Sequence, residues 1–233
     1  MAKPAAGERR TGGTRRVARV GRPPLEHAGE VDARILDAAH RVFLERGLGG
    51  ASVEEIAGQA RAGKPTIYAR FPGKEALFTA VLVRNADAKI AHYQGHVPAG
   101  ATIEDRLASV GVTVLRSVLV SDTVGLMRLA IAEARRFPDL ASNVHRMLRE
   151  HGSEAVARLL SEAAQSDDLA KLPAFAPQRL AATTRLYLDL VLLPLLMRAL
   201  FGEKLDALHA EIDQHVARGV AFFLTACRHG GVE

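Results

Sequence analysis

Residues 52–78, SVEEIAGQARAGKPTIYARFPGKEALF, decide how this chain folds. Ser52 and Glu55 have the spacing of a capping box, in which a hydroxyl and a carboxylate satisfy the free amides at a helix start. Residues 61–63 interrupt the helical pattern that follows, so the first predicted helix is short. Its buried face is formed by apolar residues that recur at helical spacing, namely Val53, Ile56, Ala57 and Ala60.

A second short helix is predicted over residues 64–70, immediately after the interruption. Pro65 is acceptable there because the amides of a first helical turn have no partners within the helix. Residues 71–73, Phe-Pro-Gly, end this helix, and a third helix opens at Lys74. The inward face of the third helix consists of Ala76, Leu77, Phe78, Val81 and Leu82.

Two short helices joined by a tight turn form a helix-turn-helix, whose second helix can lie in the major groove of DNA. Ile67 and Phe71, four residues apart, would hold the second helix on its own core. A charged, solvated helix face would look partly similar, but it would less often combine a small hydroxyl, a phenol and two cations. The donors suited to phosphates or base edges are Lys64, Thr66, Tyr68 and Arg70.

The same stretch resembles the TetR family of bacterial transcriptional repressors, whose signature has the form T-x-x-x-I-A-x-x-A-G-V-S-x-x-T-x-Y-x-x-F-x-x-K-E-x-L. Residues 35–47, ILDAAHRVFLERG, are similar to the first helix of that family. Beyond the motif, the rest of the chain is similar to the family only in its helical character. The chain matches the signature at Ile56, Ala57, Ala60, Thr66, Tyr68, Phe71, Lys74, Glu75 and Leu77.

The resemblance implies an all-α protein with two domains. Residues 29–89 would form a three-helix helix-turn-helix DNA-binding domain, and residues 90–233 a helical effector-binding and dimerisation domain. In the family resemblance Tyr68 and Lys74 contact phosphates, as a phenol and a helix N-terminus would do physically. We expect Lys64 and Pro65 to set the preference among operators. The predicted DNA contacts in this domain are Ser52, Lys64, Pro65, Thr66, Tyr68, Arg70 and Lys74.

The turn between the two short helices departs from the family pattern at two positions. Arg61 stands where the family has glycine, and a residue with a Cβ at positive φ costs about 1 kcal/mol. We therefore expect the turn to be reshaped around Gly63. Gly63 also replaces the usual N-cap serine, and it is a weaker cap by a few tenths of a kcal/mol.

Composition and length predict a globular, cytoplasmic protein. The 233 residues and 48% hydrophobic content can build a substantial core. Cys227 is the single cysteine, which excludes an intramolecular disulfide framework and fits a reducing compartment. The first residues lack the apolar core of a signal peptide, and the apolar run at 190–197 is too short to span a membrane. No membrane partner is expected.

The positive charge is concentrated at the N-terminus. The formal net charge is +5, and residues 1–22 contain seven Lys or Arg and one Glu, which leaves −1 for the rest. Residues 1–28 are rich in Gly, Pro and Arg, and we expect them to be a disordered basic arm. Arg15, Arg16 and Arg22 are expected to contact phosphates or a minor groove, where guanidinium is favoured. The alternative is a tail that only aids solubility or binds nonspecifically.

Beyond residue 90 the hydrophobic pattern predicts further helices. Thr102 and Asp105 start one of them, and Gly152 is predicted to interrupt another. Residues 178–201 are predicted to form one helix that is apolar almost all round, followed by a final helix with a near-heptad stripe. These two helices predict a four-helix bundle with a second copy, although the domain's own helices could cover them instead. The predicted homodimer interface is Leu193, Leu196, Leu205, Leu208, Ile212, Val216, Val220 and Phe223.

An unidentified small-molecule effector is expected in the C-terminal domain on the basis of the resemblance. The apolar lining is predicted from Leu126, Met127, Tyr187 and Leu190, with Arg116, Arg128 or Glu133 as polar anchors. The favoured alternative for each of these residues is an ordinary place in the core or on the surface. His92 and His96 are four apart, but Gly95 and Pro98 oppose a continuous helix, so no metal site and no cofactor are expected.

These features predict a one-component transcriptional regulator, a repressor released from a palindromic operator by its effector. One alternative is an architectural or effector-independent DNA-binding protein that relies on the basic arm. An all-α enzyme is less favoured, because no Gly-rich phosphate loop follows a strand and no Ser-His-Asp or Cys-His set is placed.

Overall fold

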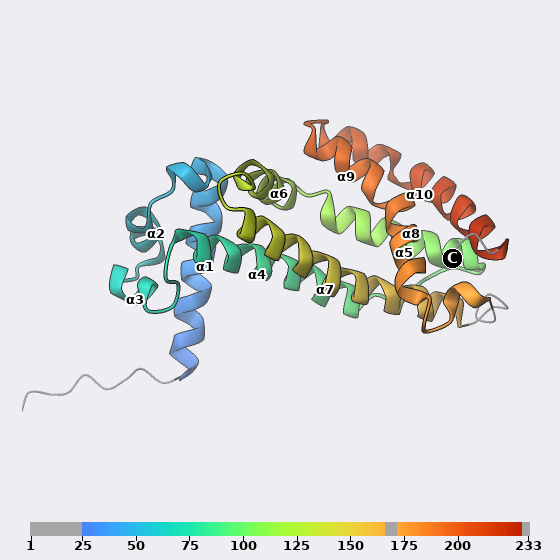
Figure 1. Ribbon diagram of the computed structural model, residues 1–233, viewed down its shortest axis with the longest axis horizontal. Helices are drawn as coiled ribbons and strands as arrows, with labels where there is room; N and C mark the ends of the chain where they lie inside the picture. The colour runs from blue at the N-terminus through green and yellow to red at the C-terminus, as the bar shows by residue number, and fades with distance from the viewer. Residues whose placement is uncertain (1–24, 166–171, 230–233) are drawn as a thin grey trace, which may run out of the picture.

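The computed structural model describes residues 25–165 and 172–229, and this part of the chain contains helices and no strand. The predicted all-α class is confirmed. Figure 1 shows an elongated molecule with α1, α2 and α3 at one end and α8 and α10 toward the other. The elements are α1 (Leu25–Gly50), α2 (Val53–Ala60), α3 (Lys64–Tyr68), α4 (Lys74–Gln94), α5 (Ile103–Val118), α6 (Ser121–Glu133), α7 (Pro138–Ala164), the 3-10 turn η2 (Pro173–Phe175), α8 (Leu180–Val191), α9 (Leu193–Leu200) and α10 (Leu205–Arg228).

The first hydrophobic core lies between α1, α2, α3 and the first half of α4. Phe43 and Phe78 meet edge to face with ring centroids 5.1 Å apart, which is a favoured geometry for aromatic pairs. Leu126 and Ala130 of α6 also belong to this core. The N-terminal domain therefore packs directly onto a helix of the C-terminal domain.

The second core lies between α5, α7, α8 and α10. Tyr187 is fully buried, and its hydroxyl donates a 2.6 Å hydrogen bond to the carbonyl oxygen of Leu107. The Tyr187 ring packs edge to face on Phe223, with centroids 5.2 Å apart. Gly111 is required beside them, because a Cβ at that position would lie 2.8 Å from the Tyr187 hydroxyl. This contact holds α5 and α8 at close range.

Helix α4 belongs to both cores. Leu77 and Phe78 near its start are buried in the first core, and Tyr93 near its end is buried in the second. Figure 1 shows α4 running along α7 through the middle of the molecule. Helix α4 therefore contributes side chains to the cores of both domains.

The structure differs from the predicted elements at four places. Helix α1 begins at Leu25, so the last four residues of the predicted arm are helical. Helix α7 continues through Gly152, because a single glycine costs only about 1 kcal/mol in a helix. The predicted helix over residues 178–201 is divided into α8 and α9 next to Pro194, whose ring cannot fit inside a continuous helix. The predicted loop at residues 166–177 contains η2 in its described part.

Within the described ranges, no single helix is long and apolar enough to cross a membrane. Two bent pairs reach the required length and composition only when taken together: α5 with α6, bent by 69°, and α8 with α9, bent by 49°.

Candidate nucleic-acid interface and effector cavity

The turn between α2 and α3 is built from the backbone. The Ser52 hydroxyl accepts a 3.1 Å hydrogen bond from the Glu55 amide and starts α2, as predicted. Arg61 ends α2 in the left-handed conformation, with φ 50° and ψ 46°. The amides of Arg61 and Ala62 donate to the carbonyl oxygens of Gly58 and Ala57, which is the Schellman pattern of helix ends. The expectation that the turn is reshaped around Gly63 is wrong, because Arg61 itself adopts the conformation that the family gives to glycine.

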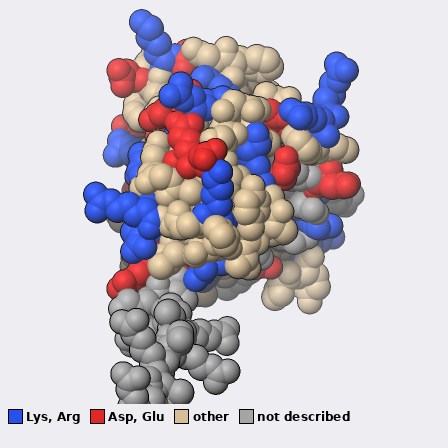
Figure 2. All heavy atoms as spheres, turned by 90° about the vertical axis from the view of Figure 1, so that its left-hand side faces the viewer, with Lys and Arg blue, Asp and Glu red and all other residues tan. Residues whose placement is uncertain are grey.

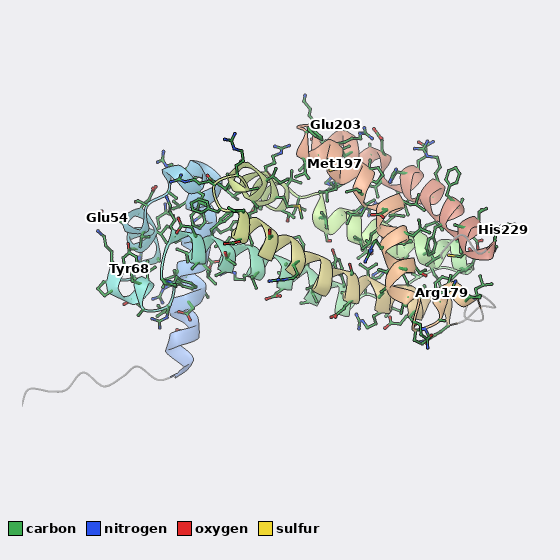
Figure 3. All side chains as sticks on the ribbon, viewed as in Figure 1. Glu54, Tyr68, Arg179, Met197, Glu203 and His229 are labelled. Carbon is green, nitrogen blue, oxygen red and sulfur yellow. The ribbon has the colours of Figure 1, made fainter. Side chains whose placement is uncertain are left out.

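Helix α3 lies on its own core through one buried side chain. Ile67 is 1% exposed, and its carbonyl oxygen accepts a 2.8 Å hydrogen bond from the Phe71 amide. Lys64 and Pro65 are exposed at the start of the helix, and Thr66 is half-buried. Tyr68 is 52% exposed and lies at the outer end of the molecule, as Figure 3 shows. An exposed phenol of this size on a short helix is available to a partner.

Some of the predicted DNA-contacting cations have partners within the chain. The Lys64 ammonium lies 2.8 Å from a carboxylate oxygen of Glu54, and this hydrogen bond lowers the pKa of Glu54. Arg70 forms an ion pair with Asp32 of α1 and donates to the Thr66 carbonyl oxygen at 3.3 Å. Arg70 therefore joins the segment that follows α3 to α1, which limits how many of its donors can reach DNA.

Lys74 also has partners within the chain. Its ammonium donates to the carbonyl oxygens of Gly49 and Ala51, at 3.3 and 3.0 Å. These carbonyls lie at the end of α1 and in the segment that leads to α2, where a cation complements the helix dipole. Lys74 thus ties the start of α4 to the end of α1, and one of its three donors remains for a phosphate.

Figure 2 looks onto the end of the molecule that carries α2 and α3. Lys and Arg side chains are spread over this face, with acidic side chains among them and uncharged surface between them. The three arginines that we assigned to the N-terminal arm, Arg15, Arg16 and Arg22, lie outside the described residues.

The C-terminal domain contains a cavity of about 280 Å³ between α4 and the helices that follow it. Its walls are almost entirely apolar, and the polar groups come from Lys89, Tyr93 and Ser153. The Tyr93 hydroxyl is paired with Ser117 at 2.7 Å, and burial raises the pKa of Tyr93. The lining residues are Ala86, Lys89, Ile90, Tyr93, Val114, Val118, Met127, Gly152, Ser153, Val156, Leu188, Leu192 and Leu196.

Of the seven residues that the sequence predicted for the pocket, Met127 alone lines this cavity. Leu126 is buried in the N-terminal core, and Tyr187 is buried in the C-terminal core. Leu190 packs against that second core. Helical periodicity identifies an apolar face but not which of two cores it joins.

The three predicted polar anchors also lie elsewhere. Arg116 lies on the surface, 3.6 Å from Asp213. Arg128 donates to the carbonyl oxygens of Ala199 and Leu200 at the end of α9. Glu133 is the last residue of α6 and does not line the cavity. Sequence reasoning missed Lys89, whose signal was a cation beside the apolar positions Ala86 and Ile90 of α4.

The predicted dimer interface requires a larger correction. The stripe on α10 is the core of its own domain, because its side chains are at most 2% exposed; these residues are Leu208, Ile212, Val216, Val220 and Phe223. Leu205 packs against the same core, and Leu196 lines the cavity. Leu193 is exposed, and its predicted place in a dimer interface stays a prediction. The alternative, that helices of the same domain cover the stripe, holds for α10.

The two histidines considered as metal ligands have other surroundings. Nε2 of His96 lies 3.1 Å from the Ser109 hydroxyl, and burial lowers the pKa of this histidine. In the described part of the chain, no group of three or more His, Cys, Asp or Glu is arranged to hold a metal ion.

A short helix with exposed donors, presented by a left-handed turn on a three-helix core, defines a helix-turn-helix DNA-binding protein. The comparison with known families gives the particular class. Residues 35–81 match the profile described as "Bacterial regulatory proteins, tetR family", and residues 105–228 match "AefR-like transcriptional repressor, C-terminal domain". The chain belongs to the TetR family of transcriptional regulators, which is not a family of enzymes.

Individual relatives agree with this assignment. The chain is 42% identical over 82 residues to the transcriptional activator FasR of Mycolicibacterium smegmatis, a match that spans 35% of each chain. A TetR-family regulator from Mesorhizobium loti has a similar structure, with TM-score 0.68 and 25% identity, over 85% of this chain and 97% of that one. The flavonoid-responsive regulator FrrA gives TM-score 0.61 and 29% identity, over 85% and 97% of the two chains.

Proposed function

We propose that this protein is a dimeric repressor that leaves a palindromic operator when a small effector enters the cavity of its C-terminal domain. The observation that carries the proposal is the position of α4. The first half of this helix forms part of the core under α3, and its second half lines the cavity through Ala86, Lys89, Ile90 and Tyr93. One rigid element therefore joins the DNA-reading unit to the space in which a ligand would bind.

Helix α6 supplies a second connection between the two sites. Leu126 and Ala130 are buried in the N-terminal core, while Met127 lines the cavity. Gly125 packs so closely on α1 that a Cβ there would lie 2.8 Å from a methyl carbon of Leu44. A ligand that displaces Met127 would press α6 against α1, because packed helices have little free volume to absorb the shift.

Dimerisation is proposed through the outer faces of α9 and α10 rather than through the buried stripe. Large apolar side chains are exposed there: Leu193 at 45%, Met197 at 39%, Phe201 at 85% and Phe222 at 70%. Apolar groups of this size on a surface commonly mark an interface. A second copy is the favoured occupant, because a two-fold dimer matches two operator half-sites about one helical turn apart.

The names of the relatives point to both directions of regulation. The profile that matches the C-terminal domain is named after a repressor, whereas FasR is named an activator. We favour repression because it requires only that the protein cover a promoter, with no surface for the transcription machinery. FrrA is described as flavonoid-responsive, which supports a small organic molecule as the effector class for a fold of this kind.

The proposal can be tested with purified protein and fragmented genomic DNA from the source organism. Selection of bound fragments should recover a small set of sites with two-fold symmetry, and the specific affinity should exceed the nonspecific affinity by about 10³-fold or more. Sedimentation should show a dimer, and Phe201→Asp together with Phe222→Asp should give monomers with weak operator binding. A monomeric wild-type protein, or binding without sequence preference, would contradict the proposal and favour an architectural role.

A further inference from the structure

Lys89 is the one charged residue among the described side chains that line the cavity. Most of the remaining lining is aliphatic, and it comes from six helices. A cation beside an apolar cavity is costly, because water that would solvate the ammonium is partly excluded. Such a group requires either a partner within the protein or a partner that arrives from outside.

Among the side chains that the structure describes, none forms a hydrogen bond or ion pair with Lys89. Burial is the largest influence on this ammonium and lowers its pKa, and Asp122 opposes the effect through charge attraction alone. Asp122 is itself exposed and lies 3.4 Å from Nε2 of His40 on α1. The described side chains therefore leave the charge of Lys89 only partly compensated.

We propose that the cavity binds an amphiphilic anion, a molecule with an apolar body and one acidic group, and that Lys89 is the residue that recognises the acidic group. This inference rests on the proposed function and specifies the chemical class of its effector. The aliphatic walls would hold the body, while a carboxylate or an acidic phenolate would form a charge-assisted hydrogen bond with the ammonium. The other polar groups that line the cavity are the hydroxyls of Tyr93 and Ser153.

The volume limits the size of the apolar body. Small-molecule sites commonly have volumes of about 300–1,000 Å³, and the 280 Å³ here lies at the lower end of that range. We therefore expect an apolar body of the size of a medium-length alkyl chain or of two fused rings.

Lys89 lies on α4, the helix whose first half forms part of the core under α3. An anion bound at Lys89 would therefore contact the same helix that supports the DNA-binding domain.

The first test compares ligands that share one body and differ in one group. Calorimetric titration of the full-length protein with octanoate, 1-octanol and octylammonium isolates the effect of charge, and 2-naphthoate with 2-naphthol repeats the comparison on a ring. We expect each carboxylate to bind roughly tenfold more tightly than its alcohol, and octylammonium to bind most weakly. Equal or tighter binding of the alcohols, or no binding by any of these probes, would overturn the inference.

The second test assigns the preference to Lys89. Lys89→Met keeps the length and apolar stem of the side chain, and it should reduce octanoate binding roughly tenfold while 1-octanol binding changes less than about threefold. Lys89→Arg should keep the preference for carboxylate. The matched control is Arg116→Met, a charge removal at a surface residue outside the cavity, which should change neither affinity. Equal loss of octanoate and octanol binding in Lys89→Met would show that Lys89 acts only in packing.

Operator binding is measured separately, so that failure of this inference can be told from failure of the proposed function. If neutral molecules release the operator and carboxylates show no advantage, the regulator proposal stands and the anion inference is wrong. If carboxylates bind with the expected preference but the protein recognises no operator, the ligand class stands on its own and the regulatory role fails.

Discussion

Lys74→Met tests whether Lys74 stabilises the DNA-binding domain or contacts DNA. The structure gives its ammonium two carbonyl partners, Gly49 and Ala51, at the junction of α1 and α2. The resemblance to the TetR family predicts instead that Lys74 contacts a DNA phosphate. Methionine keeps the apolar stem of the side chain and removes all three donors, so the two roles predict different measurements.

The expected magnitude follows from the two hydrogen bonds. Bonds from a charged donor contribute about 1.5–3 kcal/mol each when buried, and these are half-exposed, so we discount them to about 1–2 kcal/mol together. For a chain of this length, 1 kcal/mol shifts Tm by about 2–4 °C. Lys74→Met should therefore lower the Tm by about 2–8 °C.

The salt dependence of operator binding separates the two roles. Each phosphate contact contributes about 0.9 to the slope of log K against log salt, which is about 1.8 for one contact in each half of a dimer. If Lys74 is structural, fluorescence anisotropy should show weaker binding with a nearly unchanged slope. Lys204→Met, an exposed residue before α10, is the matched control and should change neither quantity. An unchanged Tm together with a slope reduced by about 1.8 would refute the structural role.

Three further outcomes are expected. Arg61→Gly should stabilise the protein by about 0.5–1 kcal/mol in urea unfolding, because glycine adopts the left-handed turn without a Cβ penalty, and a destabilised variant would contradict the turn geometry. Glu54→Gln should release Lys64 and tighten binding to random DNA roughly two- to fivefold at low salt, and unchanged binding would show that their ion pair persists on DNA. Burial raises the pKa of Cys227 to about 11, so at pH 8 the thiol should react with a disulfide reagent about 100-fold more slowly than a thiol of pKa 9.0, until denaturant exposes it.

The helix-turn-helix could be predicted from the sequence because its signals are local. Ser52 caps α2, Pro65 lies in the first turn of α3, and Ile67 is the buried anchor, as the spacing indicated. The capping box at the start of α5 is also present. The Asp105 amide donates to the Thr102 hydroxyl, and the Thr102 amide donates to the Asp105 carboxylate. These features depend on residues within four positions of one another, so one sequence is sufficient to find them.

Features that depend on which helices meet could not be predicted from periodicity. The stripe of α10 that contains Val216 has the spacing of a helix–helix interface. It does pack against other helices, but those helices belong to the same chain. Leu126 and Met127 are neighbours in α6, yet one enters the N-terminal core and the other the cavity. The intramolecular contacts of Lys74 and Arg70 could not be predicted for the same reason, because their partners lie far away in the sequence, in α1 and just after it.

Helix α4 contains no glycine or proline between Lys74 and Gln94, so it has no built-in hinge. At 1.5 Å per residue its 21 residues span about 31 Å. If α4 tilts as a rigid body by about 5° about its cavity end, its other end moves by about 2.7 Å. This approaches the 3.4 Å rise of one base pair. In the proposed mechanism, a ligand that tilts α4 by this amount would misalign the two recognition helices of a dimer with their half-sites.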